Sequence, residues 1–159
     1  MPEIVELLAS PVHRFEGRPA DGPAPAPPGG DLVDRVEIRA GLGIVGDRYF
    51  GHPAHRDAAV TVIAREWLPP GVGLTQVRRN VLVTGIAVDD LVGEVFSLDS
   101  GSGPVRLAAT RRANPCAWLD HTIGPGARKE LRGHGGVRCR PLDDGTLRVG
   151  PVEVSIGAG

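Results

Sequence analysis

Residues 78–86 read Arg-Arg-Asn-Val-Leu-Val-Thr-Gly-Ile, and their apolar centre indicates the class of fold. Val81, Leu82 and Val83 form a continuous apolar run, which predicts a strand over residues 78–84 that is covered on both faces. Similar short runs, apolar or alternating and bounded by turn residues, predict strands over residues 4–9, 33–39, 58–64, 94–98, 105–110, 137–142, 146–149 and 152–156. About eight short strands with little helix predict a mainly β protein, either a barrel or a sandwich.

The remaining segments predict turns, loops and short helices. Residues 88–93 predict one helical turn, and residues 114–121 and 126–132 predict short helices. Residues 19–31 form a loop rich in Pro and Gly, because prolines cannot donate to a sheet ladder. The chain of 159 residues is expected to form a single domain, residues 1–159. Strands and helices do not alternate and no phosphate-loop motif occurs, so a doubly wound nucleotide fold is not expected.

Charge and cysteine content exclude several classes of protein. The chain has 18 basic and 19 acidic residues and a net charge of −1, which argues against nucleic-acid and membrane-surface partners. No apolar run approaches the ~18 residues of a membrane span, and the N-terminus lacks the pattern of a signal peptide. Two cysteines then suggest reduced thiols and a cytoplasmic location. Of the basic side chains 17 are Arg, which reflects either anion recognition or a GC-rich genome.

Cys116 is the strongest candidate for chemistry. Asn114 is a good N-cap and Pro115 suits the first helical position, so we expect Cys116 in the first turn of a helix. The helix dipole, with Arg111 and Arg112 nearby, would stabilise a thiolate that attacks an electrophile, carries sulfur or ligates a soft metal. The alternative is a buried thiol that packs as a small apolar residue. That alternative is the favoured one for Cys139, which alternates with core residues on a predicted strand.

Three groups of cationic or polar residues are weaker candidates. Arg78 and Asn80 lie at the start of the buried strand predicted over residues 78–84, where they either bind an anion and a heterocycle or form a solvated strand end. Arg48 lies in a glycine-rich loop, where it either meets a phosphate, oriented by Asp47, or only pairs with Asp47 in a tight turn. His13 and Arg14, after the first strand, would add positive charge to a site.

Six stretches together resemble the MOSC domain, the C-terminal domain of molybdenum cofactor sulfurases. In chain order they are residues 10–14, 40–51, 79–86, 91–96, 115–116 and 131–137. The chain resembles a short, stand-alone bacterial member of that family. The resemblance implies a distorted, mostly antiparallel β-barrel with a few short helices. It also implies a site for a molybdenum–pterin cofactor (molybdopterin), or for sulfur delivered to one.

The resemblance assigns roles to individual residues. In amidoxime-reducing relatives the cysteine that matches Cys116 ligates molybdenum, and residues that match Arg48, Arg78 and Asn80 contact the cofactor. Those relatives have a Lys-Ser pair after the first strand, where this chain has His13 and Arg14. The implied reaction is reductive removal of oxygen from N-hydroxylated small molecules, with electrons from a donor protein.

Two other functions stay open at this stage. Cys116 would carry a persulfide from a cysteine desulfurase to a metal–sulfur centre if the chain is a sulfur carrier. A non-catalytic ligand-binding module would use the barrel pocket without thiol chemistry. Pyridoxal phosphate, the second cofactor of full-length sulfurases, is not expected, because it needs a lysine and Lys129, in a polar helix, is the only one.

Overall fold

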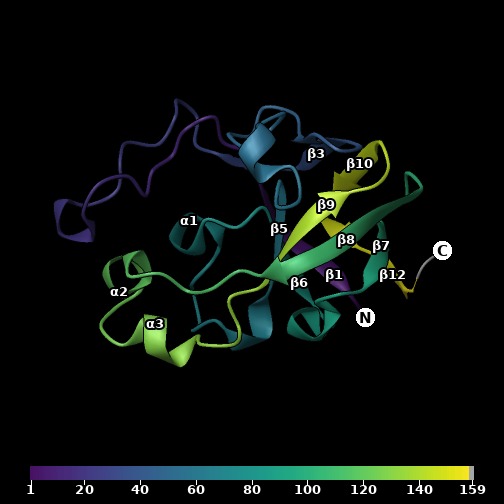
Figure 1. Ribbon diagram of the computed structural model, residues 1–159. Coiled ribbons are helices and arrows are strands. Elements are labelled where there is room, and N and C mark those ends of the chain that lie inside the picture. The colour runs from purple at the N-terminus through teal and green to yellow at the C-terminus, as the bar shows by residue number, and fades with distance from the viewer. Residues whose placement is uncertain (158–159) are drawn as a thin grey trace.

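A large mixed sheet and a small second sheet form the framework of the computed structural model, which describes residues 1–157 (Figure 1). The large sheet has the order β11-β1-β6-β5-β9-β8-β7-β12, with β2 paired to β1. Its strands are β1 (Glu3–Leu8), β2 (Leu32–Val33), β5 (Val60–Ala64), β6 (Val81–Thr84), β7 (Val95–Asp99), β8 (Pro104–Arg112), β9 (Val137–Pro141), β11 (Gly150–Pro151) and β12 (Glu153–Ile156). The second sheet has the order β10-β3-β4 and consists of β10 (Gly145–Arg148), β3 (Arg35–Arg39) and β4 (Gly43–Ile44).

The pairing within the large sheet is antiparallel except between β5 and β6, which run parallel. The two ends of the strand order, β11 and β12, are separated in the chain by Val152 alone. Because β11 pairs with β1 and β12 pairs with β7, the sheet must curl until its two ends meet the same terminal segment. The predicted mainly β, mostly antiparallel fold class is confirmed.

Helical segments are short, and the three α-helices gather at one side of the large sheet (Figure 1). The α-helices are α1 (Leu74–Val77), α2 (Trp118–Thr122) and α3 (Ala127–Glu130); the 3-10 turns are η1 (Pro19–Asp21), η2 (Pro53–His55), η3 (Arg65–Trp67) and η4 (Val88–Leu91). The parallel strands β5 and β6 are joined through η3 and α1, a crossover that the sequence did not indicate. Within residues 1–157 no helix combines the length and the apolar character needed to cross a membrane.

Strands β5 and β6 are buried on both faces, as the apolar run predicts. Val62, Val81 and Val83 belong to the main core, which the large and small sheets enclose. Ile63 and Leu82, on the opposite face, belong to a second core with residues of α1, α2 and α3. The two cores fix the link between α1 and β6, where residues 78–80 lie.

The structure differs from the sequence expectations at several boundaries. The helix predicted over residues 114–121 begins only at Trp118, with Ala117 as its N-cap. Ala113 N donates to Gly136 O at 2.9 Å and Asn114 O accepts a hydrogen bond from Arg79, so the preceding backbone groups serve tertiary contacts instead of a helix. Pro115 also disfavours helical backbone at the residue before it. The strand predicted over residues 152–156 begins one residue later, at Glu153, and β4 lies inside the predicted glycine-rich loop.

Candidate functional site

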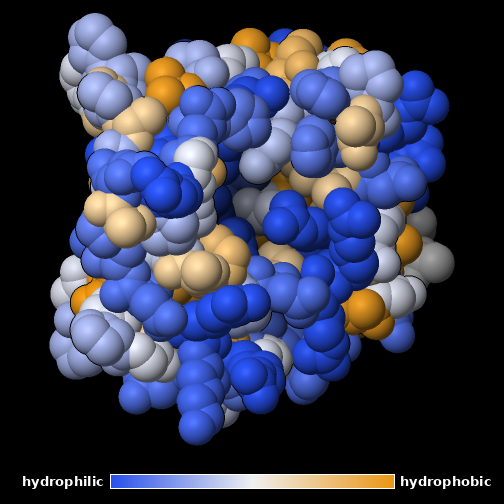
Figure 2. Space-filling model, turned by 60° about the vertical axis from the view of Figure 1, so that its left-hand side comes forward, coloured by the Kyte–Doolittle hydropathy of each residue, from blue (hydrophilic) through white to orange (hydrophobic). Residues whose placement is uncertain are grey.

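A cavity of about 190 Å³ lies where the loop after β1, the α1–β6 link and the segment before α2 meet. It is lined by His13, Arg14, Phe15, Arg48, Tyr49, Arg78, Arg79, Cys116, Trp118 and Arg138. Five of these ten residues are arginines and none is a carboxylate. Figure 2 looks onto the side of the molecule from which the long loop and the helices project, and hydrophilic residues surround a hollow near its centre.

The structure therefore brings together five of the six residues that the sequence singled out. His13 and Arg14 come from the loop after β1, Arg48 follows β4, Arg78 ends α1, and Cys116 lies between β8 and α2. These segments are far apart in the chain, and their convergence depends on the curled sheet. Whether the residues bind a cofactor stays a prediction.

Two of the cavity arginines form ion pairs with buried carboxylates. Arg48 Nη1 lies 3.1 Å from Asp47 Oδ1, the ion pair that their adjacency suggests. Arg78 pairs with Asp31, which the sequence analysis did not single out. Arg48 Nη2 also donates to the carbonyl of Arg78 at 3.2 Å, so the two arginines are linked to each other. Such pairing fixes the orientation of both guanidinium groups at the cavity wall.

Arg78 has the only left-handed backbone among the described non-glycine residues, with φ of 56°. It is the C-cap of α1, and its N–H donates to Leu74 O at 2.7 Å. Left-handed backbone is uncommon for a residue with a side chain. The turn sends Arg78 toward Asp31 and its neighbour Arg79 toward the opposite segment, so consecutive arginines reach two sides of the cavity.

Arg79 is a buried cation without a carboxylate partner in the described part of the chain. Its guanidinium donates to three main-chain carbonyls, those of Gly135 at 3.0 Å, Val77 at 3.3 Å and Asn114 at 3.4 Å. Burial, followed by repulsion from Arg138, lowers the pKa of Arg79 to about 10. The residue remains charged at neutral pH and holds together two segments that border the cavity.

Cys116 is half-buried and lies outside the helix that follows it. The expectation that it occupies the first helical turn is wrong, because α2 begins two residues later and has only five residues. Arg111 and Arg112, expected to flank the thiol, are exposed and do not line the cavity. The positive charges near Cys116 are instead those of Arg79 and Arg138, and a thiolate at Cys116 raises the pKa of both.

Aromatic rings complete the wall on either side of the thiol. Phe15 stacks on Trp118 with ring centroids 4.9 Å apart and an interplanar angle of 4°. His13 meets Tyr49 edge-on at 5.4 Å, and the Arg48 guanidinium lies 4.6 Å from the centre of the Tyr49 ring. The rings add apolar surface to a wall that otherwise carries mainly guanidinium groups.

Asn80 is the one predicted site residue that does not reach the cavity. Its side chain is fully buried, where Nδ2 donates to Leu8 O at 3.1 Å and Oδ1 accepts from Thr61 N at 2.9 Å and from Thr61 Oγ1 at 3.1 Å. The amide thus cross-links β5 and β1 beside β6. Its contacts fix the backbone that carries Arg78 and Arg79.

The sequence analysis did not identify four residues of the cavity wall: Phe15, Tyr49, Trp118 and Arg138. Phe15 and Tyr49 directly neighbour predicted site residues and Trp118 lies two residues after Cys116, so proximity in sequence could have found them. Arg138 lies in a strand whose alternation was recognised, but nothing in that pattern distinguishes it from Arg140. Arg79 was noted only as part of the Arg-Arg-Asn stretch.

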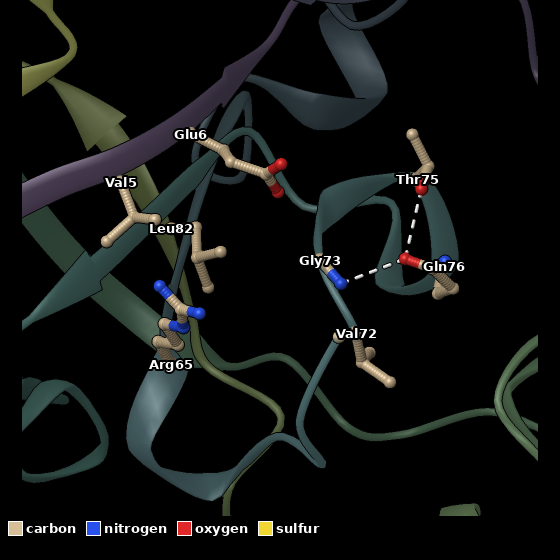
Figure 3. Close-up of a pocket in the computed structure, with 9 residues that line it drawn as sticks. Val5, Glu6, Arg65, Val72, Gly73, Thr75, Gln76 and Leu82 are labelled. Atoms are coloured by element: carbon tan, nitrogen blue, oxygen red, sulfur yellow. Dashed lines mark hydrogen bonds between the residues drawn. The ribbon is translucent and has the colours of Figure 1, made fainter.

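A second cavity, of about 290 Å³, lies between β1, η3 and α1 (Figure 3). Glu6 and Arg65 reach it from two elements, and Gly73 N donates to Gln76 Oε1 at 2.8 Å. Its lining residues include no cysteine or histidine, and Glu6 Oε1 already accepts from Leu74 N at 2.8 Å. The arginine-lined cavity is therefore the better candidate for thiol or anion chemistry.

Comparison with known proteins gives structural likeness only. A scan against protein-family models found no match, and a search of curated proteins found none. Among solved structures, the YuaD protein from Bacillus subtilis superposes with a TM-score of 0.74 at 17% identity, covering 100% of this chain and 98% of that one. YiiM from Geobacillus stearothermophilus gives 0.61 at 15% identity (98% and 75%), and YiiM from Escherichia coli gives 0.55 at 17% (98% and 70%). At these identities the likeness establishes the fold.

Proposed function

We propose that this chain, which has the fold of the MOSC-domain proteins YuaD and YiiM, binds a molybdenum–pterin cofactor in its arginine-lined cavity and acts as an oxidoreductase. The reaction we propose is the reductive removal of oxygen from N-hydroxylated small molecules. The observation that carries the proposal is that the thiol of Cys116 shares one cavity with five guanidinium groups and no carboxylate.

The donor set of the cavity fits a metal that arrives with ligands of its own. Among residues 1–157 no group of three or more His, Cys, Asp or Glu side chains is arranged to hold a metal ion. Cys116 therefore offers one soft ligand, which is too few for a bare ion but suits a metal already held by an organic sulfur ligand. The phosphate of such a cofactor matches the guanidinium groups.

Each residue has a definite part in this proposal. Cys116 would ligate molybdenum as a thiolate, while His13, Arg14, Arg48 and Arg78 would hold the phosphate end. Asn80 would not contact the cofactor, but its hydrogen bonds would fix the backbone of residues 78 and 79, which line the cavity. The bound molybdenum would supply the two-electron redox chemistry, and an electron-donor protein would supply the electrons.

The size of the cavity limits how much of the cofactor it encloses. Ligand pockets usually measure about 300–1,000 Å³. A cavity of about 190 Å³ would therefore enclose one end of a pterin cofactor and not the whole. The small volume makes the metal ligand and the phosphate contacts the features to test first.

The decisive experiment measures molybdenum and pterin in protein purified from a cofactor-producing host. We expect near-stoichiometric molybdenum and pterin in the wild type and a loss of molybdenum in Cys116→Ala. Cys139→Ala is the matched control, because Cys139 is the other thiol and is fully buried in β9. Folded wild-type protein without molybdenum or pterin would contradict the proposal. So would a molybdenum content in Cys116→Ala equal to that in Cys139→Ala.

A sulfur carrier is the second candidate, and the separation of the two thiols favours it. Cys139 is fully buried, and burial raises the pKa of its thiol. Cys116 lines the cavity and is therefore the thiol that a sulfur donor can reach. Neighbouring guanidinium groups would stabilise a persulfide anion at Cys116. After incubation with a cysteine desulfurase and cysteine, mass spectrometry should then find one added sulfur on Cys116 that a reductant removes. A metal-free protein that also gains no sulfur would leave only a ligand-binding role.

A further inference from the structure

Among the described residues, Arg138 differs from the other arginines of the cavity in having no acceptor for its guanidinium group. Arg48 and Arg78 pair with carboxylates, Arg79 donates to three carbonyls, and Arg14 Nε donates to Ala24 O at 2.6 Å. Within residues 1–157 the Arg138 guanidinium makes no hydrogen bond or ion pair, although it lines the cavity. Four of the five guanidinium groups thus already have an acceptor within the described residues, and Arg138 is the one of the five without such an acceptor.

The surroundings of Arg138 leave its charge poorly balanced. Partial burial lowers the pKa of Arg138, and repulsion from Arg111 and Arg48 lowers it further. The groups that raise this pKa are Tyr49 and Cys116, which are neutral unless they lose a proton. An anion beside Arg138 would offset both the lost hydration and the repulsion.

The backbone that carries Arg138 is held firmly. Strand β9 pairs with β5 on one edge and with β8 on the other. Val137 and Cys139 are fully buried in the main core, so Arg138 and Arg140 project from the opposite face. Arg140 is exposed and does not line the cavity, and its Nη1 lies 3.9 Å from Asp57 Oδ1. The same strand therefore carries one cavity arginine and one surface arginine.

We propose that Arg138 binds an oxyanion group of the substrate, a carboxylate, phosphate or sulfonate, next to the thiol of Cys116. The planar guanidinium offers two parallel N–H donors to such a group. The inference rests on the proposed function, because it assigns the substrate class of that site. It makes Arg138 a specificity residue that selects anionic substrates over neutral ones of the same size.

The first test uses the full chain without cofactor and sulfate as the probe. Calorimetric titration compares the wild type with Arg138→Gln and with the control Arg140→Gln. We expect Arg138→Gln to weaken sulfate binding about 10- to 100-fold, the range of one charge-assisted interaction. Arg140→Gln should change it less than about twofold, because exposed charges contribute little.

Sulfate affinity that is equal in Arg138→Gln and the wild type overturns the assignment, and so does a wild type that binds no sulfate. An equal loss in Arg140→Gln also overturns it, because the effect would then come from general surface charge. Circular dichroism establishes that the variants are folded. Should Arg138→Gln fail to fold, Arg138→Lys serves instead. It keeps the charge and loses the paired donors, so its sulfate binding should be weaker than that of the wild type, and equal binding overturns the assignment.

The second test distinguishes the substrate from the cofactor as the source of the oxyanion. Cofactor-loaded protein is assayed with benzamidoxime and with its para-carboxylate derivative. Arg138→Gln should raise KM about tenfold for the carboxylate alone, with unchanged molybdenum and pterin content. Loss of pterin in this variant would assign the oxyanion to the cofactor and overturn the substrate assignment. A wild type inactive on both compounds contradicts the proposed function, whereas the sulfate titration still decides whether Arg138 forms an oxyanion site.

Discussion

Arg79 donates a hydrogen bond of 3.4 Å from Nη2 to the carbonyl of Asn114, two residues before Cys116. Its Nε donates to Gly135 O at 3.0 Å, in the segment that Ala113 also contacts. One buried guanidinium thus ties the end of β8 to the loop before β9. The tie reaches the backbone two residues before the thiol, outside α2.

Arg79→Met should destabilise the fold by about 3 kcal/mol. The change leaves three carbonyls without their donor, and an unsatisfied buried group costs about 1–3 kcal/mol, partly offset by the removal of a buried charge. Urea unfolding followed by circular dichroism measures the effect. Arg140→Met, at an exposed position, should stay within about 0.5 kcal/mol of the wild type. Equal stability of the two variants would show that the carbonyl contacts of Arg79 are dispensable.

Asp31→Asn should cost about 3–5 kcal/mol, because it leaves the buried Arg78 guanidinium without its counter-charge. The matched control lies in the same loop. Asp21 pairs with Arg18 at 3.4 Å with both side chains largely exposed, so Asp21→Asn should cost no more than about 1 kcal/mol. Thermal unfolding of both variants checks the contrast. Similar losses in the two would mean that burial does not set the strength of the Arg78–Asp31 pair.

Gly135→Ala should destabilise the protein by about 3 kcal/mol or more through overpacking. A Cβ at this position would lie 2.0 Å from Ala113 O and 3.0 Å from Pro115 Cδ, next to the segment of Cys116. At Gly133 a Cβ meets nothing within 4 Å, although φ is +83°. Gly133→Ala should therefore cost only the strain of left-handed backbone, about 1 kcal/mol. Chemical denaturation gives both values, and the prediction fails when the order of the two is reversed.

Asp143→Asn should reduce stability at neutral pH and lose that effect in acid. Hydrogen bonds from Arg106, at 3.0 Å from Nε and 2.9 Å from Nη2, lower the pKa of Asp143 in the folded state. A carboxylate with a lowered folded pKa contributes stability above its unfolded pKa of about 3.9 and loses it as pH falls through the folded value. Urea midpoints of wild type and variant should thus differ at pH 7 and converge below the folded pKa.

The exposed Asp34 provides the control for this titration. Asp34→Asn should show the same pH dependence of the midpoint as the wild type. A difference between Asp143→Asn and wild type that persists unchanged at the lowest pH would mean that the carboxylate charge is not what stabilises this contact.

Much of the fold follows from local pattern. The run Val81-Leu82-Val83 predicts a strand with two covered faces, and the structure places its members in two different cores. Alternating residues predict β3 and β9 for the same reason, since side chains on a strand point alternately to opposite faces. Boundaries were less accurate where tertiary contacts compete with local preference, as at Asn114, whose carbonyl bonds Arg79 instead of starting a helix.

The sequence by itself determined which side chains are available for chemistry: one thiol with a Pro before it, an excess of Arg over Lys, and a mainly β chain to carry them. Only the tertiary structure decided which of them meet. Arg138 and Arg140 share a strand face, but Arg138 lines the cavity together with residues of the loop after β1, whereas Arg140 lies near Asp57 outside it. Asn80 turns inward, because Thr61 on the parallel neighbour and Leu8 satisfy its amide. Such choices depend on contacts between residues distant in the chain, and no local pattern records them.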